Sequence, residues 1–204
     1  MSYYERKLPH WQPESAALFL TWRLHGSLPA ALRPECPHLE AGEAFVAADR
    51  HLDRARRGPL WLTEQPIAEL VAEAFEFGER VLRLYDLHAY VVMANHVHVL
   101  LTPLAPMARI TRALKWFTAR KANQLLGRTG KRFWEDASYD HWVRNQDEFQ
   151  RIVRYIELNP VSAGLAERIE DWPWSSASRL RDRQGCLSPL KDRQGCLSPQ
   201  GSQG

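Results

Sequence analysis

The sequence predicts one α+β domain built around a small antiparallel sheet. Stretches that favour strands and stretches that favour helices follow one another in a mixed order, without the regular alternation that builds a parallel sheet. The length of 204 residues is typical of a single domain, and 45% hydrophobic residues supply enough apolar material for a core. A repeated, polar stretch at the C-terminal end differs in composition and is expected outside that core.

The first half of the chain predicts one strand, one loop and two helices. Residues 17–24 are rich in strand-forming residues, and residues 27–40 are rich in proline and predict a loop. Residues 42–57 and 67–81 carry apolar residues at spacings of three and four, which is typical of amphipathic helices.

The second half predicts two adjacent strands, a helix and a third short strand. Residues 84–93 and 96–101 favour strands on either side of a break at Ala94-Asn95. Residues 107–126 predict a long helix, and residues 138–143 predict a short strand.

A last helix is predicted over residues 146–158. It is expected to end at Asn159-Pro160, because a proline cannot continue a helix. Trp172-Pro173-Trp174 then closes the domain.

The C-terminal tail consists largely of a tandem repeat. Asp182–Pro189 recurs identically as Asp192–Pro199, and each copy has one cysteine and one leucine as its sizeable apolar groups. Burying these few side chains would not offset the backbone entropy lost on folding. We therefore expect a disordered tail over 182–204 and a folded domain over 1–181.

Composition excludes several classes of protein. The net charge is only +3, which does not by itself demand a nucleic-acid partner. Cysteine occurs only at positions 36, 186 and 196, too scattered for a disulfide framework or a zinc cluster. The polar N-terminus lacks the apolar stretch of a signal peptide, and no apolar run approaches the roughly 20 residues that span a bilayer. We therefore expect a cytoplasmic protein without a membrane partner.

The strongest local signal is a pair of histidines in the second predicted strand. Side chains alternate between the two faces of a strand, so His96, His98 and Leu100 share one face. The intervening residues are apolar and anchor the other face in a core. Two adjacent imidazoles suit a divalent transition metal, but a third ligand must come from elsewhere. The alternative is a chance pair of hydrogen-bonded surface histidines.

The last predicted helix presents a tyrosine and an asparagine together. Its core face is an apolar stripe formed by Phe149, Ile152, Val153 and Ile156. Tyr155 lies beside that stripe, and Asn159 follows it by four residues on the same side. The alternative is a half-buried tyrosine with an asparagine that caps the C-terminus of the helix.

A basic segment without acidic residues extends from residue 108 to residue 132. Cations follow a phosphate backbone, and aromatic rings stack on unpaired bases. The alternative is a solvated helix face, and Trp116 and Phe117 are expected in the core. The residues predicted to contact nucleic acid are Arg109, Arg112, Lys115, Arg120, Lys121, Lys131, Arg132 and Trp134.

These motifs together resemble the REP-associated tyrosine transposases, of the single-tyrosine HUH superfamily. Met93-Ala94-Asn95-His96-Val97-His98 resembles the strand that carries the family's His-hydrophobe-His motif, although proline is usual at position 94. Tyr155-Ile-Glu-Leu-Asn-Pro-Val161 resembles the family's tyrosine motif. The resemblance covers roughly residues 12 to 180 and includes Gly130–Trp134, Tyr139–His141, Arg144 and Asp171–Ser176.

The resemblance implies an HUH-type central antiparallel sheet, ferredoxin- or RRM-like, with the tyrosine helix beside it. It implies that His96, His98 and Asn159 bind Mg²⁺ or Mn²⁺ and that Tyr155 is the nucleophile. The catalytic residues would then be Tyr155, His96, His98 and Asn159.

The implied activity is that of a transposase for DNA transposition and recombination. Such an enzyme cleaves and rejoins single-stranded DNA at hairpin-forming repeats through a 5′-phosphotyrosine intermediate. The expected partner is single-stranded or hairpin DNA, without an organic cofactor, and the protein is expected to be a monomer or homodimer. Two alternatives stay open: a catalytically silent repeat-DNA-binding protein, and an unrelated metallohydrolase that activates water.

Overall fold

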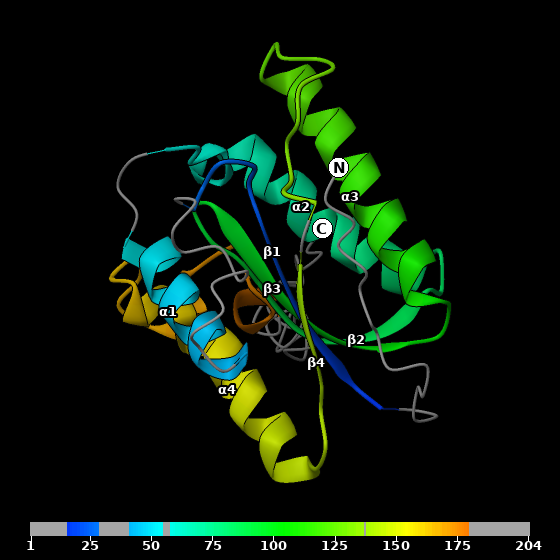
Figure 1. Ribbon diagram of the computed structural model, residues 1–204, viewed down its shortest axis with the longest axis vertical. Helices are drawn as coiled ribbons and strands as arrows, with labels where there is room; N and C mark the ends of the chain where they lie inside the picture. Colours follow the sequence, from blue (N-terminus) through cyan, green and yellow to red (C-terminus); the bar gives the residue numbers. More distant parts are fainter. Residues whose placement is uncertain (1–15, 29–40, 55–57, 137, 180–204) are drawn as a thin grey trace, which may run out of the picture.

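The computed structural model describes residues 16–28, 41–54, 58–136 and 138–179. In this part of the chain, four antiparallel strands form one sheet in the order β2-β3-β1-β4, and helices cover both of its faces (Figure 1). The strands are β1 (Leu18–Arg23), β2 (Tyr85–Val92), β3 (His96–Pro103) and β4 (Tyr139–Trp142). The helices are α1 (Ala41–Arg54), α2 (Gln65–Arg80), α3 (Met107–Leu125) and α4 (Gln146–Ser162).

The predicted fold class is confirmed, and so is each predicted strand and helix among the described residues. The predicted loop beyond residue 28, the last three residues of the first predicted helix, the domain boundary near 181 and the tail lie outside the described residues. Every described helix is too short or too polar to cross a lipid bilayer.

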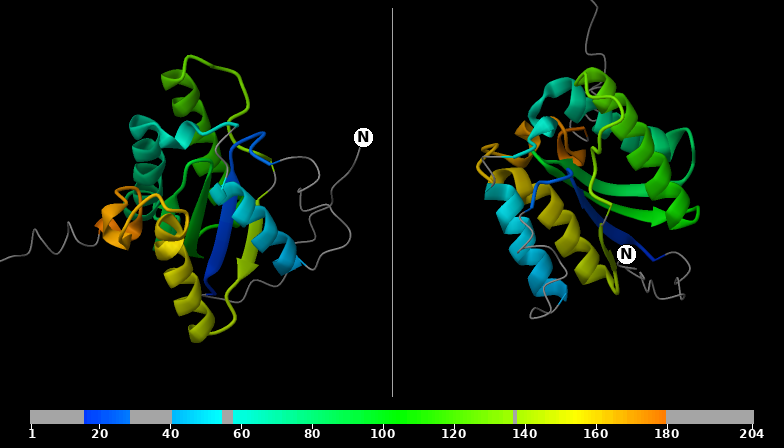
Figure 2. Two further views of the ribbon diagram at one scale, coloured as in Figure 1. Left: turned by 90° about the vertical axis from the view of Figure 1, so that its left-hand side faces the viewer. Right: turned by 45° about the horizontal axis from the view of Figure 1, so that its top comes forward.

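The two faces of the sheet carry separate cores, as the alternation along β1 and β3 predicts. Trp22 and Val97 lie on the face that α2 and α3 cover, in a large cluster of buried apolar side chains. Phe19 and Leu100 lie on the opposite face, where they pack with Ile156 of α4. Figure 2 shows α1 beside α4 on this second face, away from α2 and α3.

The last helix continues beyond the point that the sequence predicts. Pro160 lies inside α4, which ends at Ser162, with Ala163 as its C-terminal cap. A proline near the end of a helix removes only one backbone hydrogen bond, and the bond from the Ala163 amide to the Asn159 carbonyl closes the last turn at 2.9 Å. Gly164, with φ of 71°, supplies the left-handed conformation that ends the helix. Asn159 is therefore a buried helical residue and does not cap the helix.

The closing segment adds to the free edge of β2. The Trp172 indole nitrogen donates to the Val92 carbonyl at 2.9 Å, and the Val92 amide donates to the Trp174 carbonyl at 2.9 Å. Trp172 and Trp174 stack edge to face, with ring centroids 5.0 Å apart. The predicted role of these tryptophans in closing the domain follows from these contacts.

Gly78 allows α2 to approach β2 closely. A Cβ atom at position 78 would overlap the hydroxyl of Tyr85 and lie 2.8 Å from its Cζ atom. Tyr85 is fully buried, and its hydroxyl donates to the Phe75 carbonyl at 2.7 Å, so the ring has little room to move. We expect Gly78→Ala to lower the free energy of unfolding by about 1–3 kcal/mol, measured by urea denaturation.

The Tyr85→Phe background is the control for this prediction, because it removes the atom that overlaps most. There, Gly78→Ala should be less destabilising. A Gly78→Ala protein as stable as the parent would show that the helix and strand shift apart at no cost.

Candidate active site

The histidine pair of β3 is fully buried on the face that α4 covers. His96 and His98 are both 0% exposed, so they are not surface histidines. Their Nε2 atoms lie 3.1 Å apart, and the two rings meet edge to face. The predicted sharing of one strand face is confirmed.

The outer nitrogen of each imidazole is fixed by a neighbouring side chain. His96 Nδ1 lies 2.7 Å from the Asn95 amide oxygen, which can only accept, so this nitrogen carries the proton. His98 Nδ1 lies 2.7 Å from the hydroxyl of Thr21, its partner across the sheet. In neutral His96 the Nε2 atom therefore holds a lone pair that faces His98, the arrangement that a metal ligand requires.

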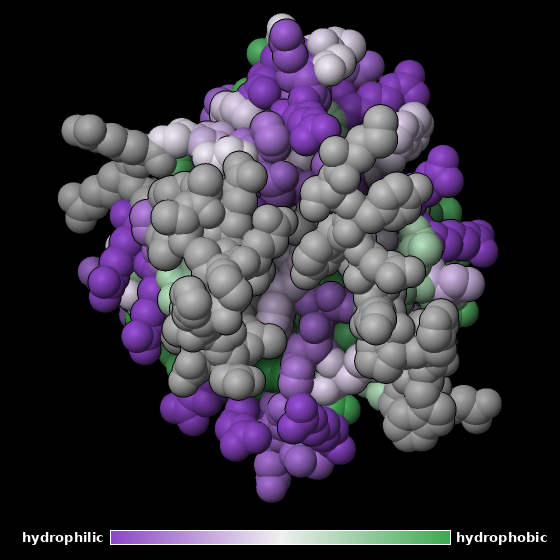
Figure 3. Space-filling model, viewed as in Figure 1, coloured by the Kyte–Doolittle hydropathy of each residue, from purple (hydrophilic) through white to green (hydrophobic). Residues whose placement is uncertain are grey.

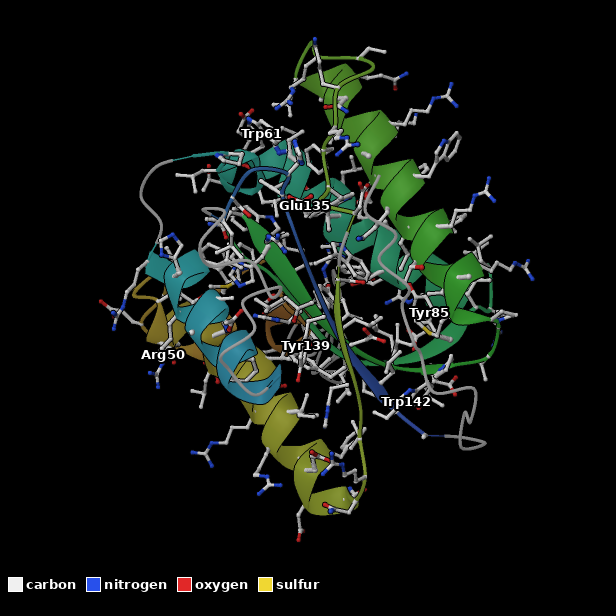
Figure 4. The ribbon with its side chains drawn as sticks, in the orientation of Figure 1. Arg50, Trp61, Tyr85, Glu135, Tyr139 and Trp142 are labelled. Carbon is white, nitrogen blue, oxygen red and sulfur yellow. The ribbon has the colours of Figure 1, made fainter. Side chains whose placement is uncertain are left out.

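Helix α1 brings two carboxylates to this pair. Asp49 is buried, and its Oδ1 atom lies 3.3 Å from His98 Nε2 and 3.7 Å from His96 Nε2. Asp53, one turn later, has its Oδ1 atom 3.6 Å from His96 Nε2. The neighbouring Arg50 lies on the outer side of the molecule (Figure 4). Sequence reasoning missed both aspartates; their spacing of four on a predicted helix was the available signal.

Burial and mutual proximity shift the pKa values of these groups. Burial, with the adjacent His98, lowers the pKa of His96 to about 3, so His96 is neutral at physiological pH. Burial alone would raise the pKa of Asp49, but the imidazoles of His98 and His96 outweigh it, and the pKa is lowered. Burial and the Asp49 carboxylate raise the pKa of Asp53 to about 7. Asp49 is therefore the carboxyl group of the cluster that is fully ionised at physiological pH.

Tyr155 reaches the same cluster from α4. Its hydroxyl donates to Asp49 Oδ2, whereas the ion-pair distances to the histidines are those of Oδ1. Its ring centroid lies 5.4 Å from that of His98 and 6.1 Å from that of Phe19, both edge to face. The side chain is 37% exposed, so one edge stays open to solvent. A phenol, a carboxylate and two imidazoles therefore converge from α4, α1 and β3.

Asn159, the predicted third ligand, is buried on α4 four residues after Tyr155. Its amide oxygen accepts no hydrogen bond from the described part of the chain. A buried acceptor without a donor is unfavourable unless something else satisfies it. The role of Asn159 as a metal ligand stays a prediction.

The residues fit a divalent cation. Ligand atoms that lie about 2.1 Å from one octahedral ion, at right angles, are about 3 Å apart. The Nε2 atoms of His96 and His98 have that spacing, and donor atoms of Asp49, His96 and His98 all lie within 4.8 Å of one another. The buried Oδ1 atoms of Asp49 and Asp53 make no hydrogen bond within the described residues, which leaves acceptors for an ion.

The predicted nucleic-acid residues lie on α3 and the loop after it, on the other face of the sheet. Arg109, Arg112, Arg120, Lys121, Lys131 and Arg132 are exposed. Hydrophilic side chains gather over the C-terminal end of α3 and this loop (Figure 3). The interface itself stays a prediction.

Two of the residues predicted to contact nucleic acid make hydrogen bonds within the protein instead. Trp134 is 6% exposed, packs edge to face on Trp22 and donates from its indole nitrogen to Thr118 Oγ1 at 2.8 Å. Its indole ring belongs to the core, so it cannot stack on a nucleobase of bound DNA. The Lys115 ammonium donates to the Glu135 carbonyl at 2.9 Å, which fixes the segment before β4.

The expected burial of Trp116 and Phe117 is wrong: they are 60% and 41% exposed. The packed face of α3 is formed by Ile110, Leu114, Thr118 and Ala122. At 3.6 residues per turn, Trp116 lies about 200° from Leu114 and so points away from the core.

Comparison with known proteins shows that part of the sequence is similar to transposases. Residues 64–159 match the family model described as Transposase IS200 like. This stretch contains His96, His98, Tyr155 and Asn159, whereas Asp49 precedes it. The chain is 30% identical to a REP-associated tyrosine transposase of Escherichia coli over 98 residues, 48% of this chain. That match spans 57% of the E. coli protein.

The fold is similar to that of a solved REP-associated tyrosine transposase bound to a REP hairpin. The TM-score is 0.53 with 22% sequence identity, and the match covers 98% of this chain and 94% of the other. At this identity the likeness concerns the fold. The family resemblance that the sequence motifs predict is confirmed.

Proposed function

Because the chain is related to the REP-associated tyrosine transposases, we propose that it is a metal-dependent transposase that cleaves and rejoins single-stranded DNA at hairpin-forming repeats. The observation that carries this proposal is the position of Tyr155, whose hydroxyl donates to the carboxylate that faces the buried histidine pair. A purely structural tyrosine has no need of a cluster of metal-ligating groups around its hydroxyl.

Asp49 links the nucleophile to the histidines through its two oxygens. Oδ2 accepts the Tyr155 hydroxyl, and Oδ1 faces the two Nε2 atoms. The lowered pKa of Asp49 keeps it ionised, so it holds the phenol in place and is positioned to take its proton. This matters because a free tyrosine has a pKa near 10 and is a poor nucleophile at neutral pH.

The proposed reaction is a transesterification at phosphorus. The Tyr155 oxygen forms a bond to the scissile phosphorus, and the bond from phosphorus to the 3′ oxygen breaks. The phenolic proton leaves through Asp49 to solvent, and the departing oxygen takes up a proton from water to become a 3′-hydroxyl. The 5′-phosphotyrosine keeps a phosphodiester linkage, so attack by a 3′-hydroxyl rejoins the strand without ATP.

His96, His98 and Asn159 would hold the Mg²⁺ or Mn²⁺ ion, with Asp49 as an additional ligand. A bound divalent cation polarises phosphate oxygens and stabilises the charge that develops in the transition state. Two imidazoles with carboxylate and amide oxygens would suit Mn²⁺.

Asp49→Asn is expected to raise the Mn²⁺ concentration required for half-maximal cleavage by about 10-fold or more, because it removes the negative charge beside the ion. The variant keeps the shape of the side chain. Titration of cleavage against Mn²⁺ measures the effect.

Two further variants separate the ligands. Asp53→Asn is the matched control on the same helix and should change the Mn²⁺ requirement less, because Asp53 lies within ion-pair distance of His96 but not of His98, whereas Asp49 lies within that distance of both. Asn159→Ala should raise the requirement if its unpaired oxygen is a ligand. A normal requirement in Asp49→Asn together with a raised one in Asn159→Ala would remove Asp49 from the ligand set.

The exposed basic residues of α3 and its loop would contact the phosphates of the bound DNA. The experiment that tests the function as a whole is incubation with single-stranded DNA that carries a hairpin, with Mn²⁺, followed by detection of protein-linked DNA under denaturing conditions. Intact DNA in this assay, with DNA binding retained, would favour a silent binding protein.

A further inference from the structure

Trp116 is an exposed tryptophan on the face of α3 that points away from the core. Arg109, Arg112 and Arg120 are also exposed, at spacings of three and four along the same helix. Residues at these spacings share one face, so the three arginines lie on the same face of α3 as Trp116. A large aromatic ring on a solvated, basic helix face is unfavourable for folding alone and has no partner in the core.

The two sides of the indole ring differ. The Arg120 guanidinium, one turn after Trp116, lies over the ring at 5.3 Å from its centroid. The residues before Trp116 line an open pocket of about 790 Å³ that borders the ring: Pro106, Ala108, Arg109, Arg112 and Ala113. The ring therefore separates a cation on one side from an open pocket on the other.

The charge around this pocket favours an anionic ligand. Helix α3 contains no acidic residue along its whole length. Arg109, Arg112 and Arg120 form no ion pair with any acidic side chain of the described residues. A ligand that pairs an aromatic ring with phosphates meets both features, because the ring stacks on Trp116 while the phosphates neutralise the arginines.

We propose that Trp116 is a stacking platform for one unpaired nucleobase of single-stranded DNA, with Arg109 and Arg112 on the adjacent phosphates. This inference rests on the proposed function, because it names how the DNA substrate is gripped. It differs from phosphate contact alone, since an unpaired base is required.

The platform lies on the opposite side of the sheet from Tyr155, because α3 and α4 cover opposite faces (Figure 1). A bound strand must pass around the sheet to occupy both places. The platform therefore contributes to binding and not to the chemical step, so its loss should raise KM and leave kcat unchanged.

The test is fluorescence anisotropy with a labelled oligothymidylate, a blunt duplex of the same length and a single strand of abasic sites. Trp116→Leu should weaken binding of oligothymidylate by roughly 5- to 150-fold, the effect of losing one base–aromatic stack. Trp116→Phe should restore most of the affinity. Binding of the duplex and of the abasic strand should not change. Leu125→Ala is the matched control, because Leu125 is a similarly exposed apolar residue of α3.

The salt dependence separates stacking from phosphate contact. Trp116→Leu should keep the slope of log K against log salt, whereas Arg112→Ala should reduce its magnitude by about 1. Trp116→Leu protein that binds oligothymidylate as tightly as the parent overturns the proposal. So does an equal loss on all three probes, or a change in oligomeric state without a change in DNA affinity.

The outcome is independent of whether the protein cleaves DNA. If no covalent adduct forms but Trp116→Leu selectively weakens single-strand binding, the transposase proposal fails and the platform stands. If the adduct forms with an unchanged KM in Trp116→Leu, the platform fails and the transposase proposal stands.

Discussion

Tyr155→Phe should reduce strand cleavage by at least about 1,000-fold and abolish protein-linked DNA, because it removes the only atom that attacks phosphorus in the proposed reaction. The phenyl ring keeps its edge-to-face contacts with His98 and Phe19. The substitution removes the hydrogen bond to Asp49 at a partly exposed position, so the fold and DNA affinity should persist. Cleavage of labelled DNA and an affinity measurement on the same preparation check both parts.

Tyr139→Phe is the matched control for this variant. Tyr139 also lies on the α4 face of the sheet, with its ring edge to face with Phe19 at 6.3 Å. Cleavage should survive this substitution. An adduct that forms in Tyr155→Phe but disappears in Tyr139→Phe would reassign the nucleophile.

His96→Ala should abolish metal-dependent cleavage, with a loss of at least about 100-fold, because stabilisation of the transition state by the ion is worth several kcal/mol. It should also abolish stabilisation by Mn²⁺. An ion that binds only the folded protein raises its stability by about 2.7 kcal/mol at 100 times Kd. The melting temperature with and without Mn²⁺ therefore reports the site independently of activity.

His88→Ala is the control, since His88 lies outside the cluster and its Nε2 atom is 2.7 Å from the Thr102 hydroxyl. It should retain both cleavage and the Mn²⁺-dependent rise in melting temperature. His96→Ala should melt cooperatively in the absence of metal. If it cleaves DNA with normal dependence on Mn²⁺, the histidine pair is not the metal site.

The sequence predicts those parts of the site that lie within one element. The alternation along β3 places His96 and His98 on one face, because strand periodicity alone decides it. The apolar stripe of α4 likewise predicts that Ile156 faces the sheet and that Tyr155 lies beside it. The role of Tyr155 as the nucleophile, by contrast, is implied only by the family resemblance.

Asp49 could not be found in this way, because its role depends on where α1 lies in space. Helical periodicity predicts that Ala48 and Leu52 are buried, but not which strand the helix covers. More than 40 residues separate Asp49 from the histidines along the chain.

Trp116 and Pro160 show two limits of residue-type rules. Trp116 was expected in the core because large aromatic residues usually are, yet its helical phase relative to Leu114 points it outwards. Pro160 was expected to end the helix, yet the helix continues for two residues because only one hydrogen bond is lost. In both cases geometry within the helix outweighs the preference of the residue type.

The chemical structure of the cleavage products tests the central claim most directly. The protein is incubated with Mn²⁺ and single-stranded DNA that carries a hairpin, denatured and digested, and the DNA-linked peptide is identified by mass spectrometry. We expect one peptide, linked through Tyr155 to a 5′-phosphate, with a 3′-hydroxyl on the released fragment and no adduct without the ion. Cleaved DNA with 5′-phosphate ends and no linked peptide would contradict it and identify water, not Tyr155, as the nucleophile.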